Sequence, residues 1–195
     1  MVLRIAAGIA AMALAACASS PVTLVALPPP AESAPVAAPG TPDRVLLREV
    51  TLPQYLDSFP VVVGRRGNLL LMSGNTEWAE PLPVAATRVL RDALSQRLGP
   101  SRMLLAGERR PAEAELALEF MALDPGDSGL NLDARWHLSC RAAGRSYRGG
   151  RIRLQAALES ATPEAVASAT TDALARLAAA LAEVLQCDAG SSKDQ

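Results

Sequence analysis

The chain has 195 residues and a formal net charge of -1, and 20% of its residues are charged. This length predicts one domain or two small ones, and the 50% share of hydrophobic residues excludes a wholly disordered chain. The balance of charges excludes a general attraction to nucleic acid or to anionic lipid. Aromatic residues make up only 3% of the chain, so we expect a core of aliphatic side chains and alanine.

The first 16 residues have the features of a bacterial signal peptide. Residues 5–13 form an apolar run that is shorter than the roughly 20 residues of a membrane-spanning helix. The sequence Leu14-Ala15-Ala16-Cys17 follows, and it matches the lipobox that directs the attachment of lipid to a cysteine. We therefore predict cleavage before Cys17 and anchoring of the mature chain by acyl chains, palmitate included. Ala18 is a residue type that favours sorting to the outer membrane.

A proline-rich segment follows the lipobox. Residues 19–42 contain seven prolines, and proline lacks the N–H group that helices and sheets require. We therefore predict an extended tether over residues 17–43, interrupted by β-forming residues at 23–27. If residues 23–27 join the sheet, the domain lies within about 15 Å of its anchor. If they do not, the tether reaches roughly 80 Å from the membrane.

Residues 44–188 are predicted to form the folded domain, and residues 189–195 a disordered polar tail. Strand patterns lie at residues 45–50, 61–63, 69–72, 103–106, 115–123, 130–140 and 145–154. Turns are predicted at 73–76 and 124–127, and helices begin at Glu80-Pro81 and at Thr162. This order predicts an α+β fold, with a mostly antiparallel mixed sheet and two helices packed on one face.

The sequence contains none of the common catalytic motifs. It has no phosphate-binding glycine loop, no cluster of metal ligands and no serine nucleophile elbow. The single histidine, His137, falls on the polar face of a predicted strand, where we favour a solvated residue over a functional one. We therefore expect no catalytic residue, no metal and no cofactor, and no nucleic-acid partner.

Two cysteines remain after Cys17. Cys140 ends the apolar face of a predicted strand, and Cys187 ends the last predicted helix, which should lie over that face. In an oxidising compartment this placement allows a disulfide between them, and two buried free thiols are the alternative.

Arginines gather on the last two predicted strands, and no acidic residue separates them after Asp133. Their positions are Arg135, Arg141, Arg145, Arg148, Arg151 and Arg153. This strip would bind an anionic headgroup or an acidic partner, or it is the solvated face of a hairpin. A docking site for a protein partner or for a second copy of the chain would lie on this face or on a sheet edge.

Two short motifs at a fixed spacing resemble a known family. Leu52-Pro53-Gln54-Tyr55-Leu56 is followed by Trp78-Ala79-Glu80-Pro81-Leu82 and then by Arg88-Val89-Leu90. With the lipobox and Ala134-Arg135-Trp136, these segments resemble the PqiC-like ABC-type transport auxiliary lipoproteins. The chain departs from the pattern at Ser58-Phe59-Pro60, where the family usually has Arg-Pro and a polar residue.

The resemblance implies a non-catalytic lipoprotein that faces the periplasm and supports membrane integrity. It implies an ABC/MCE-type envelope system that moves lipid or hydrophobic solute between membranes. The implied partners are an MCE-domain protein and the permease and ATPase of the transporter. The candidate structural or partner-contacting residues are Tyr55, Trp78, Glu80, Pro81, Leu82 and Arg88. The alternative function is a stand-alone lipid-binding lipoprotein, which would need a cavity lined by the apolar sheet face.

Replacement of Cys17 by serine tests the lipobox. The variant lacks the thiol that would carry the lipid, so its precursor should stay unprocessed or unlipidated. Membrane fractionation and mass spectrometry of the N-terminal peptide measure this outcome. A Ser20→Ala variant should behave like the wild type, whereas normal membrane fractionation of Cys17→Ser would contradict the prediction.

Overall fold

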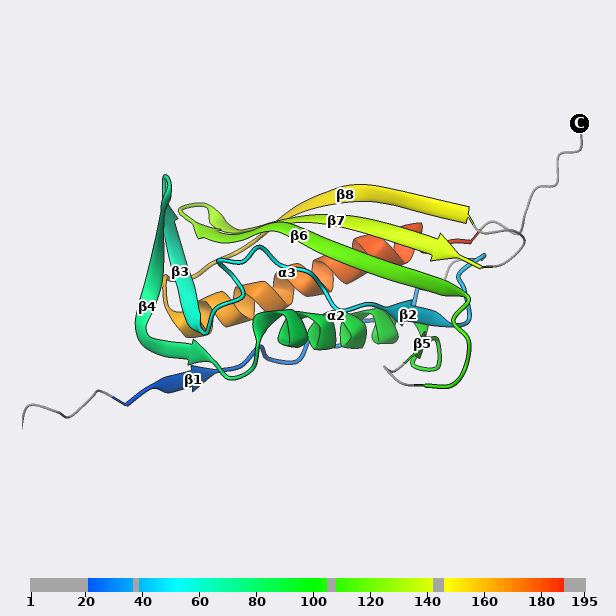
Figure 1. Cartoon of the computed structure of the whole chain (residues 1–195), viewed down its shortest axis with the longest axis horizontal. Helices are drawn as coiled ribbons and strands as arrows, with labels where there is room; N and C mark the ends of the chain where they lie inside the picture. The colour runs from blue at the N-terminus through cyan, green and yellow to red at the C-terminus, as the bar shows by residue number, and fades with distance from the viewer. Residues whose placement is uncertain (1–20, 37–38, 105–107, 142–145, 188–195) are drawn as a thin grey trace, which may run out of the picture.

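The computed structural model describes residues 21–36, 39–104, 108–141 and 146–187. The signal peptide, Cys17, Arg145 and the tail at 189–195 lie outside the described residues. The elements are β1 (Thr23–Val25), β2 (Val45–Leu47), β3 (Pro60–Arg66), β4 (Leu69–Trp78), α2 (Leu82–Leu98), β5 (Met103–Leu104), β6 (Ala114–Gly126), β7 (Gly129–Cys140), β8 (Ser146–Ala156) and α3 (Pro163–Val184). Both helices lie on one side of the long strands (Figure 1).

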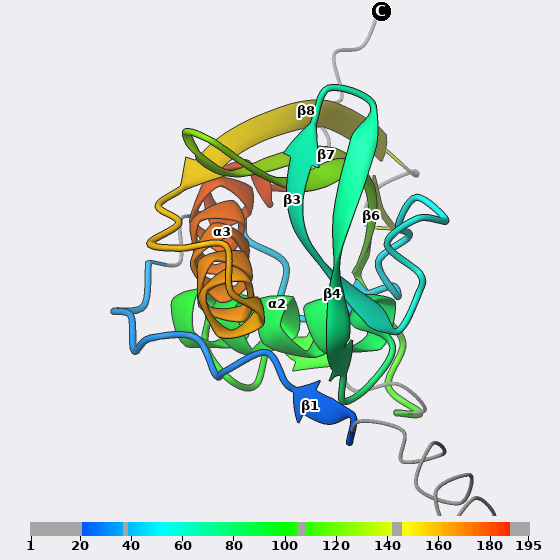
Figure 2. The same cartoon turned by 90° about the vertical axis from the view of Figure 1, so that its left-hand side faces the viewer.

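The described strands form two mixed sheets, where the sequence pattern predicts one. A five-stranded sheet has the order β5-β2-β6-β7-β8, and a three-stranded sheet has the order β1-β4-β3. The pairs β6–β7, β7–β8 and β3–β4 are antiparallel, while β1–β4, β2–β5 and β2–β6 are parallel. Figure 2 shows the β3–β4 hairpin standing across one end of the molecule. The predicted α+β class is therefore confirmed.

The core lies between the five-stranded sheet and the helices. Strand β7 alternates as predicted, with six buried side chains on its inner face, which are Leu130, Leu132, Ala134, Trp136, Leu138 and Cys140. Leu174, Leu177 and Leu181 of α3 are fully buried in the same core cluster. The core is aliphatic and alanine-rich because the helices approach the sheet through small side chains.

Two predicted turns and one predicted face are wrong. A bulge at Met121 shifts the register of β6, so Leu123 is buried in place of Ala122. The strand then continues through Gly126, which pairs with Gly129, and the turn shortens to residues 127–128. Residues 73–76 lie inside β4, because Thr76 pairs with Thr23 of β1.

The proline-rich segment lies against both helices over its described part. Leu27 is 3% exposed, and the Thr171 hydroxyl of α3 donates to the Pro28 carbonyl at 3.1 Å. On α2, the Gln96 amide oxygen accepts from the backbone N–H of Ser33 at 2.9 Å. The segment is therefore packed where the sequence pattern predicts a structureless excursion.

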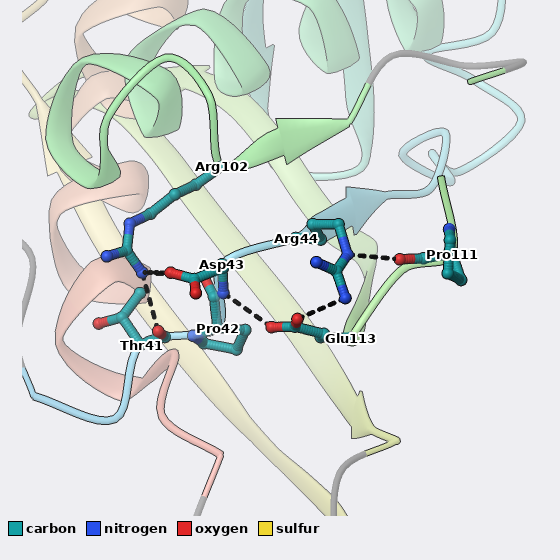
Figure 3. A network of polar contacts seen from close by, with 7 residues as sticks. All are labelled: Thr41, Pro42, Asp43, Arg44, Arg102, Pro111 and Glu113. Carbon is teal, nitrogen blue, oxygen red and sulfur yellow. Dashed lines mark hydrogen bonds and ion pairs between the residues drawn. The ribbon is translucent and has the colours of Figure 1, made fainter. Parts of the chain in front are cut away.

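A polar network fixes the end of this segment to the start of three strands (Figure 3). Arg102, just before β5, donates to the Thr41 carbonyl at 2.8 Å and pairs with Asp43 at 3.0 Å. The N–H of Asp43 donates to the Glu113 carboxylate at 2.9 Å, and Arg44 pairs with the same carboxylate. These contacts hold β2 between β5 and β6 with the parallel register that backbone pairing requires.

A disulfide joins the end of β7 to the residues after α3. Cys140 and Cys187 are bonded, with their Cα atoms 5.8 Å apart. The N–H of Cys187 also donates to the Gly40 carbonyl at 3.0 Å. The end of the last helix is thereby tied both to the large sheet and to the proline-rich segment.

The disulfide should stabilise the fold through the loop that it closes. The bonded residues are 47 apart in sequence, for which loop-closure entropy gives about 4 kcal/mol as an upper figure. Replacing Cys140 and Cys187 together by alanine should lower the free energy of unfolding by up to that amount. Urea denaturation measures the difference. A Cys17→Ser chain, denatured without reductant, should show no titratable thiol; two thiols would contradict the bond.

Candidate functional site

The Tyr55 motif forms a polar cluster between the loop before β3 and strand β6. The Tyr55 hydroxyl donates to Asp124 Oδ1 at 2.8 Å, and Arg65 Nε lies 3.1 Å from Asp124 Oδ2. The Arg65 guanidinium also lies 5.6 Å from the centre of the Tyr55 ring, within cation–π range. The cluster therefore ties the small sheet to the large one.

The electrostatics of this cluster indicate a structural role. Burial and the hydrogen bond to Asp124 raise the pKa of Tyr55 above its ordinary value, although Arg65 acts in the opposite direction. Burial lowers the pKa of Arg65, but the hydrogen bond and charge of Asp124 outweigh it and raise the net value. Tyr55 therefore stays protonated and Arg65 stays charged near neutral pH, and neither group is poised to exchange protons. No sequence pattern pointed to Arg65 or to Asp124, and Asp124 lies far from Tyr55 along the chain.

The Trp78 motif is a core element at the end of β4. Trp78 is 5% exposed and Leu82 is 2% exposed. The Trp78 N–H donates to the Phe59 carbonyl at 2.7 Å, and the next residue, Ala79, donates to the Val25 carbonyl at 2.8 Å. The burial of Trp78 agrees with a role in the core. The backbone of Trp78 and Ala79 links the end of β4 to the residue before β3 and to the end of β1.

The rest of this motif begins helix α2. Pro81 is the N-cap residue, and Leu82 is the first residue of the helix. Glu80 accepts from Arg88 Nη2 at 2.6 Å, with both side chains about one-third exposed. The motif residues therefore form two separate clusters, around Tyr55 and around Trp78. Among the residues that the structure describes, no group of histidine, cysteine or acidic side chains has metal-binding geometry.

The arginine strip is paired with acidic residues of the same sheet. Arg141 lies 2.7 Å from Glu115, and Arg135 lies 3.3 Å from Glu119. Strand β6 supplies both acids, because it pairs with β7 on the side opposite to β8. The outer face is therefore a ladder of alternating charges.

The remaining described arginines of the strip are also engaged. Arg151 binds Asp133 through two hydrogen bonds, and Arg153 shares that carboxylate at 3.1 Å. Arg148 points to the other side of β8 and donates to the Gln186 carbonyl at 3.0 Å, two residues after the last residue of α3. Cations near a helix C-terminus stabilise it by offsetting its partial negative charge.

Strand β8 is the long edge strand of the large sheet. Trp136 of β7 packs over it at Gly150, where an added Cβ would lie 2.9 Å from the indole nitrogen. Beyond that contact, Tyr147 is 71% exposed. Tyr147 borders a shallow depression of about 310 Å³ with Glu115, Ser139 and Arg141. This edge is the part of the predicted docking face that the fold leaves open.

A comparison with family models identifies the chain. The model described as "ABC-type transport auxiliary lipoprotein component" matches residues 26–182. The chain belongs to this family. The resemblance based on the Tyr55 and Trp78 motifs is thereby confirmed, and the match also covers most of the proline-rich segment. No curated protein sequence matches the chain.

Solved structures show that other proteins share this fold. An uncharacterised protein is 18% identical with a TM-score of 0.65, and the match covers 86% of this chain and 100% of that one. Protein XCC0632 from Xanthomonas campestris, of the DUF330 family, is 16% identical with a TM-score of 0.58, covering 82% of this chain and 92% of that one. By length and composition, helix α3 could cross a membrane, but 61% of its most apolar 18-residue window is buried inside the domain, as in a core helix.

The charge ladder predicts a pH dependence of stability. Hydrogen bonds from Arg151, and then from Arg153, lower the pKa of Asp133 below its usual value. A carboxyl group with a lowered pKa in the folded state stabilises the fold above its unfolded pKa, and this contribution is lost as the pH falls through the folded pKa.

Replacement of Asp133 by asparagine should therefore destabilise the domain at pH 7. The difference in the free energy of unfolding between this variant and the wild type should shrink below about pH 4, as the Asp133 carboxyl of the wild type becomes protonated. Urea unfolding at pH 7 and pH 3 measures both values. The exposed Asp172 of α3 offers a control, since Asp172→Asn should change stability little; an Asp133 effect that is equal at both pH values would contradict the assignment.

Proposed function

We propose that the chain is a non-catalytic, lipid-anchored subunit of an ABC-type envelope transport system that includes an MCE-domain protein. It would face the periplasm from the outer membrane and help move lipid or hydrophobic solute between membranes. The observation that carries this proposal is the family match over residues 26–182, which begins only nine residues after the lipobox cysteine, Cys17. The Tyr55 and Trp78 clusters support it, since they build the fold and hold no reacting group.

We place the contact with the protein partner at the outer edge of β8. An edge strand presents unpaired backbone N–H and C=O groups to which another chain can hydrogen-bond. Tyr147 adds an exposed aromatic side chain beside a depression, the kind of residue that dominates binding energy at interfaces. The outer-face charges are paired within the sheet, so they contribute more to the choice of partner than to affinity.

Lipid binding by the domain alone is not favoured. The apolar face of the large sheet is covered by α2 and α3, and a void bordered by Leu56, Val62 and Trp78 measures only about 10 Å³. That space holds at most one water molecule and no acyl chain. A groove of about 440 Å³ beside the β3–β4 hairpin is open to solvent and has Arg66 and Asp127 in its wall.

The test is purification of the full-length lipoprotein from membranes of its own bacterium, followed by mass spectrometry. An MCE-domain protein and the permease and ATPase of a transporter should co-purify. Tyr147→Ser should reduce their recovery, while Leu69→Ser, with 67% exposure at the far hairpin, should not. Absence of all transporter components from the wild-type preparation would overturn the proposed function, and equal recovery with Tyr147→Ser would overturn the β8 site.

A further inference from the structure

Three exposed apolar residues lie at the end of the small sheet where β1 pairs with β4. Val22 and Leu24, at β1, are 55% and 61% exposed, and Phe59, just before β3, is 57% exposed. We call these three residues the basal patch. Leu24 pairs with Glu77 of β4, which in turn pairs with Pro60 of β3. Leu24 and Pro60 are therefore two strands apart on the same face of the small sheet, about 10 Å, and Phe59 immediately precedes Pro60 at the start of β3.

The chain leads from this patch directly to the lipobox. Only the residues between Cys17 and Val22 separate them. A fully extended chain of five residues spans at most about 18 Å. A lipid on Cys17 would therefore keep Val22 within about 18 Å of the bilayer. The proline-rich segment does not lengthen this tether, because it follows β1 in the chain and is packed against the helices.

The fold holds the patch in a fixed position. Strand β1 pairs with β4 over Thr23, Leu24 and Val25, and the following Leu27 is buried. In Figure 2, β1 lies at the bottom of the molecule and the tip of the β3–β4 hairpin at the top. The patch therefore cannot turn away from the anchor without breaking the backbone pairing of the sheet.

The charges around the patch indicate which kind of surface fits it. Glu77 pairs with Leu24, and the exposed Asp57 lies two residues before Phe59. Acidic neighbours do not favour anionic headgroups. Exposed valine, leucine and phenylalanine favour the apolar boundary between headgroups and acyl chains, where aromatic side chains also partition.

We propose that the basal patch inserts into the surface of the bilayer that holds the lipid anchor, and so sets the orientation of the domain on the membrane. The proposal rests on the lipid anchor of the proposed function but on none of its protein partners. The contact is apolar, so it should persist in zwitterionic vesicles and at high salt. The opposite end of the small sheet, near Leu69, would point away from the bilayer.

A tryptophan probe with a chemically attached lipid tests this inference. The mature chain, residues 17–195, has Cys17 as its single free thiol, because Cys140 and Cys187 are bonded. Cys17 is coupled to maleimide-phosphatidylethanolamine in phosphatidylcholine vesicles with brominated or plain acyl chains. Chemical coupling makes the result independent of lipidation in the cell and of any transporter.

The readout compares two matched positions. Phe59→Trp should lose about half of its added emission in the brominated vesicles, because a side chain in the interface lies within about 10 Å of the acyl chains. Leu69→Trp, 67% exposed at the hairpin tip, should lose none. Emission of the unmodified chain, from the buried Trp78 and Trp136, is subtracted in each case.

A second variant separates contact from proximity. Adding Leu24→Asp to Phe59→Trp should restore much of the lost emission, since a charge in the patch opposes insertion, and circular dichroism should show an unchanged fold. Equal emission of Phe59→Trp in brominated and plain vesicles would overturn the proposal. Equal quenching of Leu69→Trp would also overturn it, because the domain would then have no preferred orientation.

Discussion

Burial of one face of β6, β7 and β8 against two helices is the interaction on which the rest of the structure depends. It commits alternate side chains of β7, and of β6 up to the bulge at Met121, to the core, and the intervening side chains face water together. On that outer face, acids of β6 and β7 stand opposite arginines of β7 and β8 and pair with them across the strands. Since the inner face is filled and the outer face is paired, the sheet edges remain for contacts with other molecules.

The family motifs are best explained as parts of this architecture. Tyr55 anchors the small sheet to β6 through Asp124, and Trp78 ends β4 inside the core, just before α2 begins. Both positions join the small sheet to the rest of the domain. In the roles proposed above, Tyr147 on β8 would contact a protein partner and Phe59, just before β3, would contact the membrane.

Much of the fold could be predicted from the chain alone, because its strongest signals are local. The alternation of β7 and the capping of α3 by Thr162 depend on neighbours within a few residues. The features that sequence analysis missed do not follow from local alternation. The bulge at Met121 changes which side chains of β6 are buried, and the acids that pair with Arg135 and Arg141 come from the neighbouring strand β6. The packing of the proline segment depends on hydrogen-bond partners such as Thr171, far along the chain.

The pairing of β1 with β4 has a mechanical consequence. A chain held by a lipid at one end and docked to a partner at the other is under tension whenever the two attachment points move apart. Because β1 runs parallel to β4, a pull on its N-terminal end along the strand direction would load their backbone hydrogen bonds in shear. Several backbone hydrogen bonds then share the force at once, where a perpendicular pull would break them one after another. After β1, the next parts of the chain to bear the force would be the buried Leu27 and the packed proline-rich segment, and only then the core.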